Sequence, residues 1–135
     1  MKVVFADTGY WVALLSPKDR LNTIAREVSG RLGQTRILTT EMVLDELLAA
    51  LSGLPERALA IRGVDAICAN PNVEVVPQTS IQFREAFALY KKMTDKAWSL
   101  TDCASINIMK VRGITEALAH DRHFEQAGFE IAPSG

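Results

Sequence analysis

The chain has 135 residues, of which 48% are hydrophobic and 23% are charged. This length predicts a single domain over residues 1–135, and the composition excludes an intrinsically disordered chain. Fifteen basic and sixteen acidic residues give a formal net charge of -1, which excludes a polybasic nucleic-acid binder and leaves room only for a local basic face.

The cysteine content and the apolar segments predict a reduced, cytoplasmic, soluble protein with no membrane contact. Cys68 and Cys103 are too few for a disulfide framework or a zinc motif. Asp7 and Gly9 interrupt the apolar start, and no small-residue cleavage site follows it, so a signal peptide is not expected. No apolar run approaches the roughly 18 residues that a membrane span requires.

Two strands and two helices are predicted in the first fifty residues. Val3–Ala6 is a β-branched and aromatic run that suits a buried strand, and a turn-forming Asp-Thr-Gly sequence ends it. Apolar residues recur at helical spacing from Leu21 to Leu32, where a glycine follows as a stop. Residues 36–39 suit a second strand, and Thr40 suits the N-cap of a helix over residues 41–51 with one apolar stripe.

The second half of the chain continues the alternation of helices and strands. A helix over residues 57–69 leads through an Asn-Pro-Asn turn into a strand over residues 73–76. The remaining predicted elements are a helix over residues 81–92, a helix over residues 103–111 opened by a capping box at Ser99–Asp102, and short strands over residues 116–119 and 129–131 around a small helical turn.

This order of elements, β-α-β-α-α-β-α-α-β-(α)-β, predicts the fold class. Strands separated by helices pair in parallel through crossover connections, so we expect a three-layer α/β/α sandwich with a mainly parallel central sheet of about five strands. Open parallel sheets place their binding sites at the carboxyl ends of the strands. The residues that follow the strands are therefore the first candidates for function.

Acidic residues stand at several of these positions. Asp7 closes the first strand and Asp121 closes the fourth. Asp102 lies in the first turn of a helix, and Glu46 lies one turn into the helix after the second strand. Because these acids belong to separate segments, they come together only in the folded chain, at one edge of the sheet.

Each acid by itself also fits a structural role. Asp102 suits a helix cap, Asp7 suits a turn, and Asp121 suits an ion pair with the arginine beside it. In the helix after the second strand, Asp45 and Glu46 are adjacent, and either suits a solvated position. The hypothesis of a functional site therefore rests on the four segments jointly.

A cluster of carboxylates points to a metal ion. Carboxylates within about 4–6 Å of one another repel, and their pKa values rise unless a cation compensates. Oxygen-only ligand sets suit Mg²⁺ or Mn²⁺. Such a site supports hydrolysis of phosphodiester bonds, because the ion lowers the pKa of a bound water and neutralises charge on the phosphate, and it needs no nucleophilic Ser or Cys.

Four segments of the chain carry a family resemblance. VVFADTGYWVALL, TTEMVLDELLAAL, SLTDCASINIMKVRGI and EALAHDRHFEQAGFEI resemble, in order and spacing, the four acidic motifs of PIN domains, the fold of VapC-type toxin ribonucleases. The similarity covers nearly the whole chain, whereas residues 54–96 are generic helix and strand. The last two segments are the most specific, because together they form a long composite pattern.

The resemblance implies a Mg²⁺- or Mn²⁺-dependent endoribonuclease that acts on RNA and is silenced by an antitoxin protein. It implies that Glu46, rather than Asp45, is the second acid, because the family pattern is VL-x-E-L. Many relatives carry a further acid shortly after the fourth motif, whereas the next acid here is Glu125, four positions on. The implied catalytic and metal-binding residues are Asp7, Glu46, Asp102 and Asp121, with Thr8 and Thr101 as supporting residues.

Other residues suggest contacts with partners. Lys91, Lys92 and Arg122 could contact the RNA backbone, which would make the affinity fall with salt. By analogy with the family, the helices near residues 47–54 and 61–67 could serve a homodimer or an antitoxin contact, although the same stripes suit a core.

His120 and His123 flank Asp121 and raise the question of a transition-metal site. Without a third imidazole or thiolate, we expect that one histidine supports the loop and that the other is exposed.

Two other classes of function remain open. The first is a non-catalytic scaffold of the same fold that binds a protein or RNA. The second is a phospho-acceptor signalling domain, which also uses Mg²⁺ and carboxylates at strand ends. Such domains carry paired acids after the first strand and a Lys after the last, whereas this chain has the single Asp7 and no Lys after Ile131.

Overall fold

The computed structural model describes residues 2–132 and contains a five-stranded sheet. The strand order is β3-β2-β1-β4-β5, and every neighbouring pair is parallel. The predicted α/β class with a parallel sheet is confirmed, and all of its strands run in one direction. The strands are β1 (Val3–Ala6), β2 (Arg36–Thr40), β3 (Val73–Val76), β4 (Glu116–Leu118) and β5 (Glu130–Ala132).

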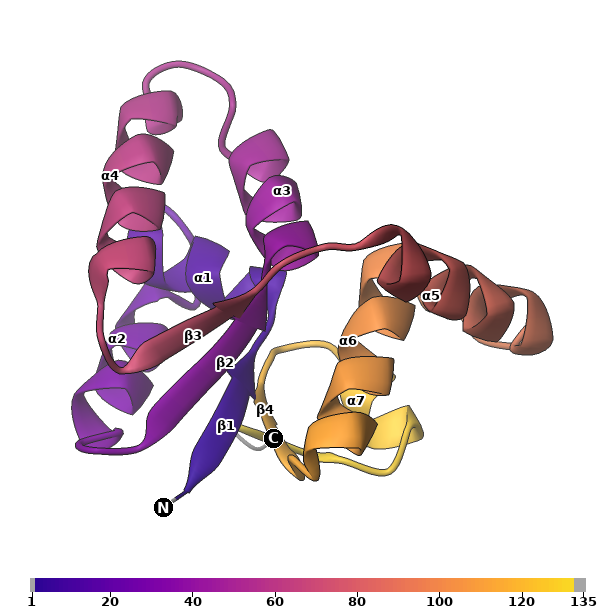
Figure 1. Ribbon diagram of the computed structural model, residues 1–135. Helices are drawn as coiled ribbons and strands as arrows, with labels where there is room; N and C mark the ends of the chain where they lie inside the picture. Colours follow the sequence, from indigo (N-terminus) through magenta and orange to yellow (C-terminus); the bar gives the residue numbers. More distant parts are fainter. Residues whose placement is uncertain (1, 133–135) are drawn as a thin grey trace.

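Helices cover both faces of the sheet and form the outer layers of the predicted sandwich. Figure 1 shows α1, α2 and α4 on one face and α6 and α7 on the other, while α5 extends away from the sheet. In residues 2–132, no helix has the length and apolar character that crossing a membrane requires. The helices are α1 (Thr8–Leu15), α2 (Asn22–Arg31), α3 (Glu41–Ala50), α4 (Glu56–Ala69), α5 (Ser80–Lys92), α6 (Leu100–Arg112) and α7 (His123–Gln126).

One helix was not anticipated from the order of elements. Between β1 and β2 the sequence predicted a single helix, whereas the structure has α1 directly after Asp7 and then α2. α1 packs against α2, α3 and α4, so several of its sides are buried. It therefore lacks the polar face whose alternation with an apolar face allows a helix to be predicted from the sequence. Trp11 of α1 donates from Nε1 to Oγ1 of Thr39 at 3.2 Å, which ties α1 to the end of β2.

Short-range signals set the ends of the helices as predicted. Thr40 caps α3 by accepting a hydrogen bond from the backbone N–H of Val43 at 3.1 Å. Ser99 and Asp102 form the capping box of α6, and Gly113 ends that helix in the left-handed conformation with φ 67°. A further capping box opens α5 at Thr79, where the sequence had carried the same T-x-x-Q signal unnoticed.

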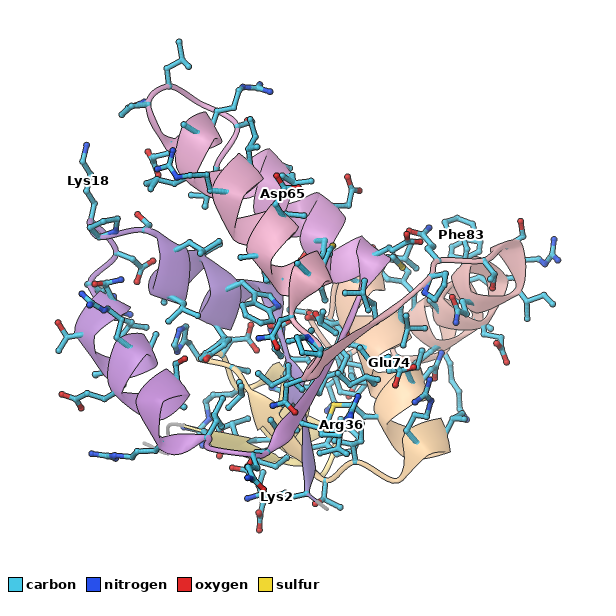
Figure 2. All side chains as sticks on the ribbon, turned by 60° about the vertical axis from the view of Figure 1, so that its left-hand side comes forward. Lys2, Lys18, Arg36, Asp65, Glu74 and Phe83 are labelled. Atoms are coloured by element: carbon cyan, nitrogen blue, oxygen red, sulfur yellow. The ribbon has the colours of Figure 1, made fainter. Side chains whose placement is uncertain are left out.

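The core lies between the sheet and the helices and fixes the position of α7. Phe5 of β1 and Phe124 of α7 are both fully buried, with ring centroids 6.1 Å apart. The amino edge of the sheet carries an ion pair, in which Arg112 makes a bidentate contact of 3.1 and 2.8 Å with Glu74. Figure 2 labels Glu74 and Lys2 near this edge. The carboxyl edge is therefore the place to look for the acidic site.

Candidate metal centre

The four predicted acids gather at the carboxyl edge of the sheet. Asp7 follows β1 as the N-cap of α1, and Asp121 lies in the bend after β4. Asp102 is the third residue of α6, and Glu46 lies in α3. Asp102, Asp121 and Glu46 all lie close enough to Asp7 for their charges to raise its pKa.

Asp7 is the most deeply buried of these acids, and the pKa of its carboxyl group is raised. Burial raises the pKa of Asp7 from 3.8 to about 7. A hydrogen bond from the backbone N–H of Thr8 lowers the pKa, while the negative charges of Asp102, Asp121 and Glu46 add to the increase. The negative charge of a buried carboxylate near three more acids is unfavourable in the protein alone. A bound cation would stabilise this charged form.

Asp102 is held by two contacts on the same oxygen. Its Oδ2 atom accepts a hydrogen bond from the backbone N–H of Ser99 at 2.9 Å. The Nδ1 atom of His123 lies 2.8 Å from the same Oδ2 atom. Asp102 therefore serves both as the structural cap predicted for it and as an oriented carboxylate, since Oδ1 takes part in neither contact.

Asp121 and His123 complete a compact group with Asp102. The backbone N–H of His123 donates to Oδ1 of Asp121 at 3.1 Å, and Nδ1 of His123 lies 3.5 Å from that same oxygen. One ligand atom from each of the three residues lies within 4.8 Å of the others. Within residues 2–132, Asp7 and Glu46 are not members of this compact group, so they stand further from it along the same edge.

Glu46 is tied to the first motif by a hydrogen bond. The Thr8 hydroxyl donates to Oε1 of Glu46 at 2.7 Å across 38 residues of sequence. Glu46 is half-buried, whereas its neighbour Asp45 is exposed. Thr8 thus contacts two acids, because its backbone N–H also hydrogen-bonds Asp7. The geometry distinguishes Glu46 from Asp45, which the residues alone did not.

Thr101 and the two histidines lie around the same acids. Thr101 is buried in the first turn of α6, and the hydrogen bonds on the Asp102 carboxylate come from Ser99 and His123. The expectation that one histidine is exposed is wrong, because His120 and His123 are both half-buried. The contact of His123 was missed because it depends on how α7 packs against α6.

The predicted RNA-contact residues are accessible but lie in different places. Arg122 is exposed beside Asp121 and pairs with Glu125 at 3.5 Å. Lys91 lies on α5 with its Nζ atom 4.6 Å from the centroid of the Phe87 ring. Of these cations, Arg122 is the one adjacent in sequence to a predicted acid.

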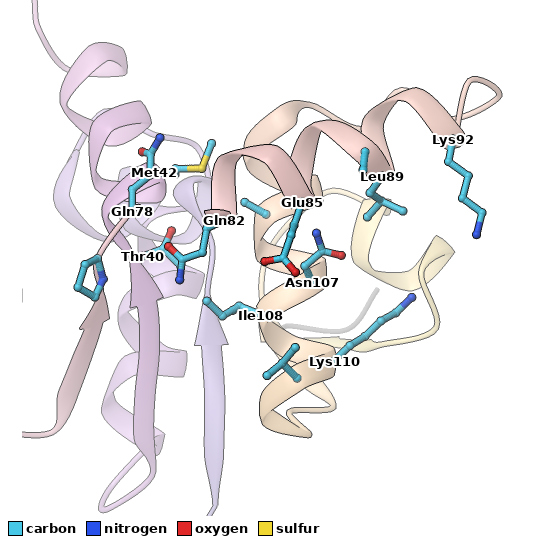
Figure 3. Close-up of a pocket in the computed structure, with 14 residues that line it drawn as sticks. Thr40, Met42, Gln78, Gln82, Glu85, Leu89, Lys92, Asn107, Ile108 and Lys110 are labelled. Atoms are coloured by element: carbon cyan, nitrogen blue, oxygen red, sulfur yellow. The ribbon is translucent and has the colours of Figure 1, made fainter. Parts of the chain in front are cut away.

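A cavity of about 580 Å³ lies apart from the acids. It is bounded by α5, α6 and the start of α3, and none of the four predicted acids lines it. Figure 3 shows Gln82 and Glu85 of α5 with Asn107 of α6 among its lining residues, and Lys92 and Lys110 beside them. Its walls do not contribute to the acidic cluster.

The donor set at the acidic cluster fits a divalent cation. Carboxylate oxygens from four segments of the chain suit Mg²⁺ or Mn²⁺, and a bound cation would offset the repulsion that the other acids exert on Asp7. The compact group of Asp102, Asp121 and His123 offers a first set of ligand atoms. The carboxylates of Asp7 and Glu46 are nearby acids that can share in holding an ion or its waters.

Comparison with known proteins gives matches over nearly the full chain. The PIN domain model matches residues 4–130. The chain is 26% identical over 132 residues to the "23S rRNA-specific endonuclease VapC20" of Mycobacterium tuberculosis, which covers 97% of this chain and 99% of that protein.

Solved structures show the same similarity in three dimensions. The crystal structure of Mycobacterium tuberculosis VapC20, described as a sarcin-ricin loop cleaving toxin, has a TM-score of 0.85 at 25% identity and covers 93% of this chain and 95% of that chain. VapBC2 from Rickettsia felis, bound to a promoter DNA fragment, has a TM-score of 0.70 at 10% identity, with 96% of each chain covered. FitAcB from Neisseria gonorrhoeae has a TM-score of 0.61 at 15% identity, with 95% of each chain covered. The last two share the fold.

Proposed function

Because the chain belongs to the PIN domain family, we propose that it is a metal-dependent endoribonuclease and the toxin of a toxin–antitoxin pair. The observation that carries the proposal is the acidic edge of the sheet, where the buried Asp7 carboxyl lies near three acids from separate segments. The 26% identity to an endonuclease specific for 23S rRNA makes structured ribosomal RNA the substrate class to test first.

The residues at the centre have distinct roles in this proposal. Asp7, Glu46, Asp102 and Asp121 hold Mg²⁺ or Mn²⁺, which when bound supplies an activated water and neutralises charge on the phosphate. Ser99 orients Asp102, and the Thr8 hydroxyl orients Glu46, so two of the carboxylates are held before RNA binds.

The exposure of the acids gives a direction of entry for RNA. The Asp121 side chain is 48% exposed, whereas that of Asp102 is 9% exposed. We therefore infer that a phosphate would reach the centre from the Asp121 side, where the exposed Arg122 guanidinium would contact it. Lys91 and Lys92 would contact more distant parts of the RNA, and the buried Thr101 would restrict the first turn of α6, which carries Asp102.

An antitoxin protein is the partner that this function requires, and a homodimer is a second expected assembly. Support comes from apolar side chains left exposed on α3, on α4 and in the connection between them, namely Leu48, Leu54 and Ile61. Light scattering coupled to size-exclusion chromatography tests the dimer, and a monomer at all concentrations would remove that part of the proposal.

RNA cleavage mapping tests the activity. Total ribosomal RNA is incubated with the protein in EDTA, in Mg²⁺ and in Mn²⁺, and the cleaved positions are read by primer extension. We expect defined cuts only with a divalent ion, and their loss in Asp102→Asn. Cleavage that persists in excess EDTA would contradict the metal-dependent mechanism. Absence of both cleavage and thermal stabilisation by the ions would favour the non-catalytic scaffold.

A further inference from the structure

We propose that Nδ1 of His123 is a nitrogen ligand of the divalent ion at this centre, and that it shifts the preference of the site from Mg²⁺ toward first-row transition ions. This inference rests on the proposed function and assigns a residue outside the four acids. Its basis is the compact group, in which Nδ1 of His123 lies 2.8 Å from Asp102 Oδ2 and 3.5 Å from Asp121 Oδ1.

The position of the imidazole is set by the fold. The backbone N–H of His123 donates to Asp121 Oδ1 at 3.1 Å, which fixes the start of α7 relative to that acid. The next residue, Phe124, is fully buried against Phe5 of β1, so α7 is anchored in the core. His123 itself is half-buried. An imidazole held this way meets the two carboxylates without the loss of freedom that a flexible surface side chain would undergo.

The identity of the ligand atom decides which ion the site prefers. Mg²⁺ prefers oxygen ligands, whereas imidazole nitrogen is a common ligand of first-row transition ions. A group with one nitrogen and two carboxylates therefore gains affinity for the transition ions and little for Mg²⁺. Mn²⁺ is the weakest binder of that series, so a preference for Mn²⁺ over Mg²⁺ is a stringent test.

The same short contact is also consistent with a different role, which the experiment separates. If His123 only donates a hydrogen bond to Asp102, it is a positioning residue, and nitrogen does not reach the ion. Direct ligation places the imidazole nitrogen on the ion itself. The magnetic coupling between the bound ion and the imidazole nitrogen distinguishes these two arrangements, and its measurement needs no cleavage assay.

Pulsed electron paramagnetic resonance on the 135-residue chain loaded with Mn²⁺ alone is the direct test. In the wild-type protein, we expect the electron spin echo of the bound Mn²⁺ to be strongly modulated by a coupled ¹⁴N nucleus. In a sample whose histidines alone are labelled with ¹⁵N, we expect the modulation pattern of ¹⁵N instead. The modulation is lost in His123→Asp and retained in the matched variant His120→Asn. The wild-type isotope exchange tests the ligand even if His123→Asp folds poorly.

Calorimetric titration with Mn²⁺ and Mg²⁺ supplies the second measurement. We expect the ratio of Mn²⁺ to Mg²⁺ affinity to fall by about tenfold or more in His123→Asp, a loss at least as large as that from removing an outer partner of a metal site. Mn²⁺ bound without nitrogen coupling would overturn the assignment of His123 while leaving the metal centre intact. Failure of the wild-type protein to bind Mn²⁺ would overturn the proposed function as well.

Discussion

The backbone N–H of Ser99 donates to Oδ2 of Asp102 at 2.9 Å, and the backbone N–H of Asp102 donates to Oγ of Ser99 at 3.0 Å. Ser99, the N-cap of α6, therefore also orients a carboxylate of the acidic cluster. Helix capping and metal binding are coupled at this position, because loss of the cap lets the first turn and its carboxylate move together.

Ser99→Ala is predicted to weaken both properties. Loss of the cap should lower the free energy of unfolding by about 1 kcal/mol. The backbone N–H of residue 99 still donates to Asp102 in this variant, so loosening of the first turn should lower metal affinity by up to about tenfold, the lower end of the range for losing an outer partner. Thr79→Ala removes the matching capping box of α5 and is the control. Chemical denaturation should show equal losses of stability in the two variants. Calorimetric titration should show reduced metal affinity only in Ser99→Ala. Equal metal affinities would refute the coupling.

Asp7→Asn is predicted to stabilise the metal-free protein while abolishing cleavage. The change removes a charge that burial and three neighbouring acids disfavour, so the melting temperature without metal at pH 8 should rise by on the order of 10 °C. The stabilisation of the wild-type protein by Mg²⁺ or Mn²⁺ should be largely absent in the variant. Differential scanning calorimetry with and without the ion measures both effects. A lower melting temperature for the metal-free variant would show that Asp7 is not electrostatically strained.

The metal-free protein is predicted to lose part of its stability as the pH rises from about 4 to about 7. Below pH 4 the Asp7 carboxyl is protonated in the folded and unfolded states alike. Between pH 4 and 7 the unfolded chain releases this proton while the folded protein retains it, so unfolding becomes more favourable. A pKa raised from 3.8 to about 7 corresponds to about 4 kcal/mol.

Urea denaturation at several pH values isolates this contribution from that of other carboxyl groups. The stability of Asp7→Asn minus that of the wild-type protein, both in EDTA, should grow across the interval from pH 4 to pH 7. Saturating metal should suppress the growth. A difference that stays constant with pH would mean that Asp7 ionises normally in the folded protein.

Glu46→Gln and Asp45→Asn form a matched pair of substitutions on one helix. Glu46 accepts the Thr8 hydroxyl and lies near Asp7, whereas Asp45 is exposed. Glu46→Gln should reduce cleavage by at least about 100-fold, because it removes a charge from the centre. Asp45→Asn should leave the cleavage rate within about twofold of wild type, since exposed charges are screened by solvent. Single-turnover cleavage of one RNA under identical ionic conditions makes the comparison, and similar losses in both variants would contradict it.

Much of the fold followed from patterns that lie within a few residues of one another. The β-branched run of β1, the cap at Thr40 and the stop at Gly113 depend on local backbone geometry, so they could be predicted from the sequence. The helix α1 was not anticipated, because burial on several sides removes the alternation of polar and apolar residues on which prediction depends. The residues that follow the strands nominated Asp7 and Asp121, whereas the choice of Glu46 over Asp45 came from the family resemblance.

The sequence by itself determined which side chains are available and at which ends of which elements they stand. Only the tertiary structure decided that Glu46 rather than Asp45 meets Thr8, and that His123 meets Asp102. These pairs are separated by 38 and 21 residues. Their distances depend on how α3 packs against α1 and how Phe124 anchors α7 in the core. Local propensities favour the type and the ends of each helix or strand. Contacts between side chains far apart in the sequence depend in addition on how all the elements between them pack.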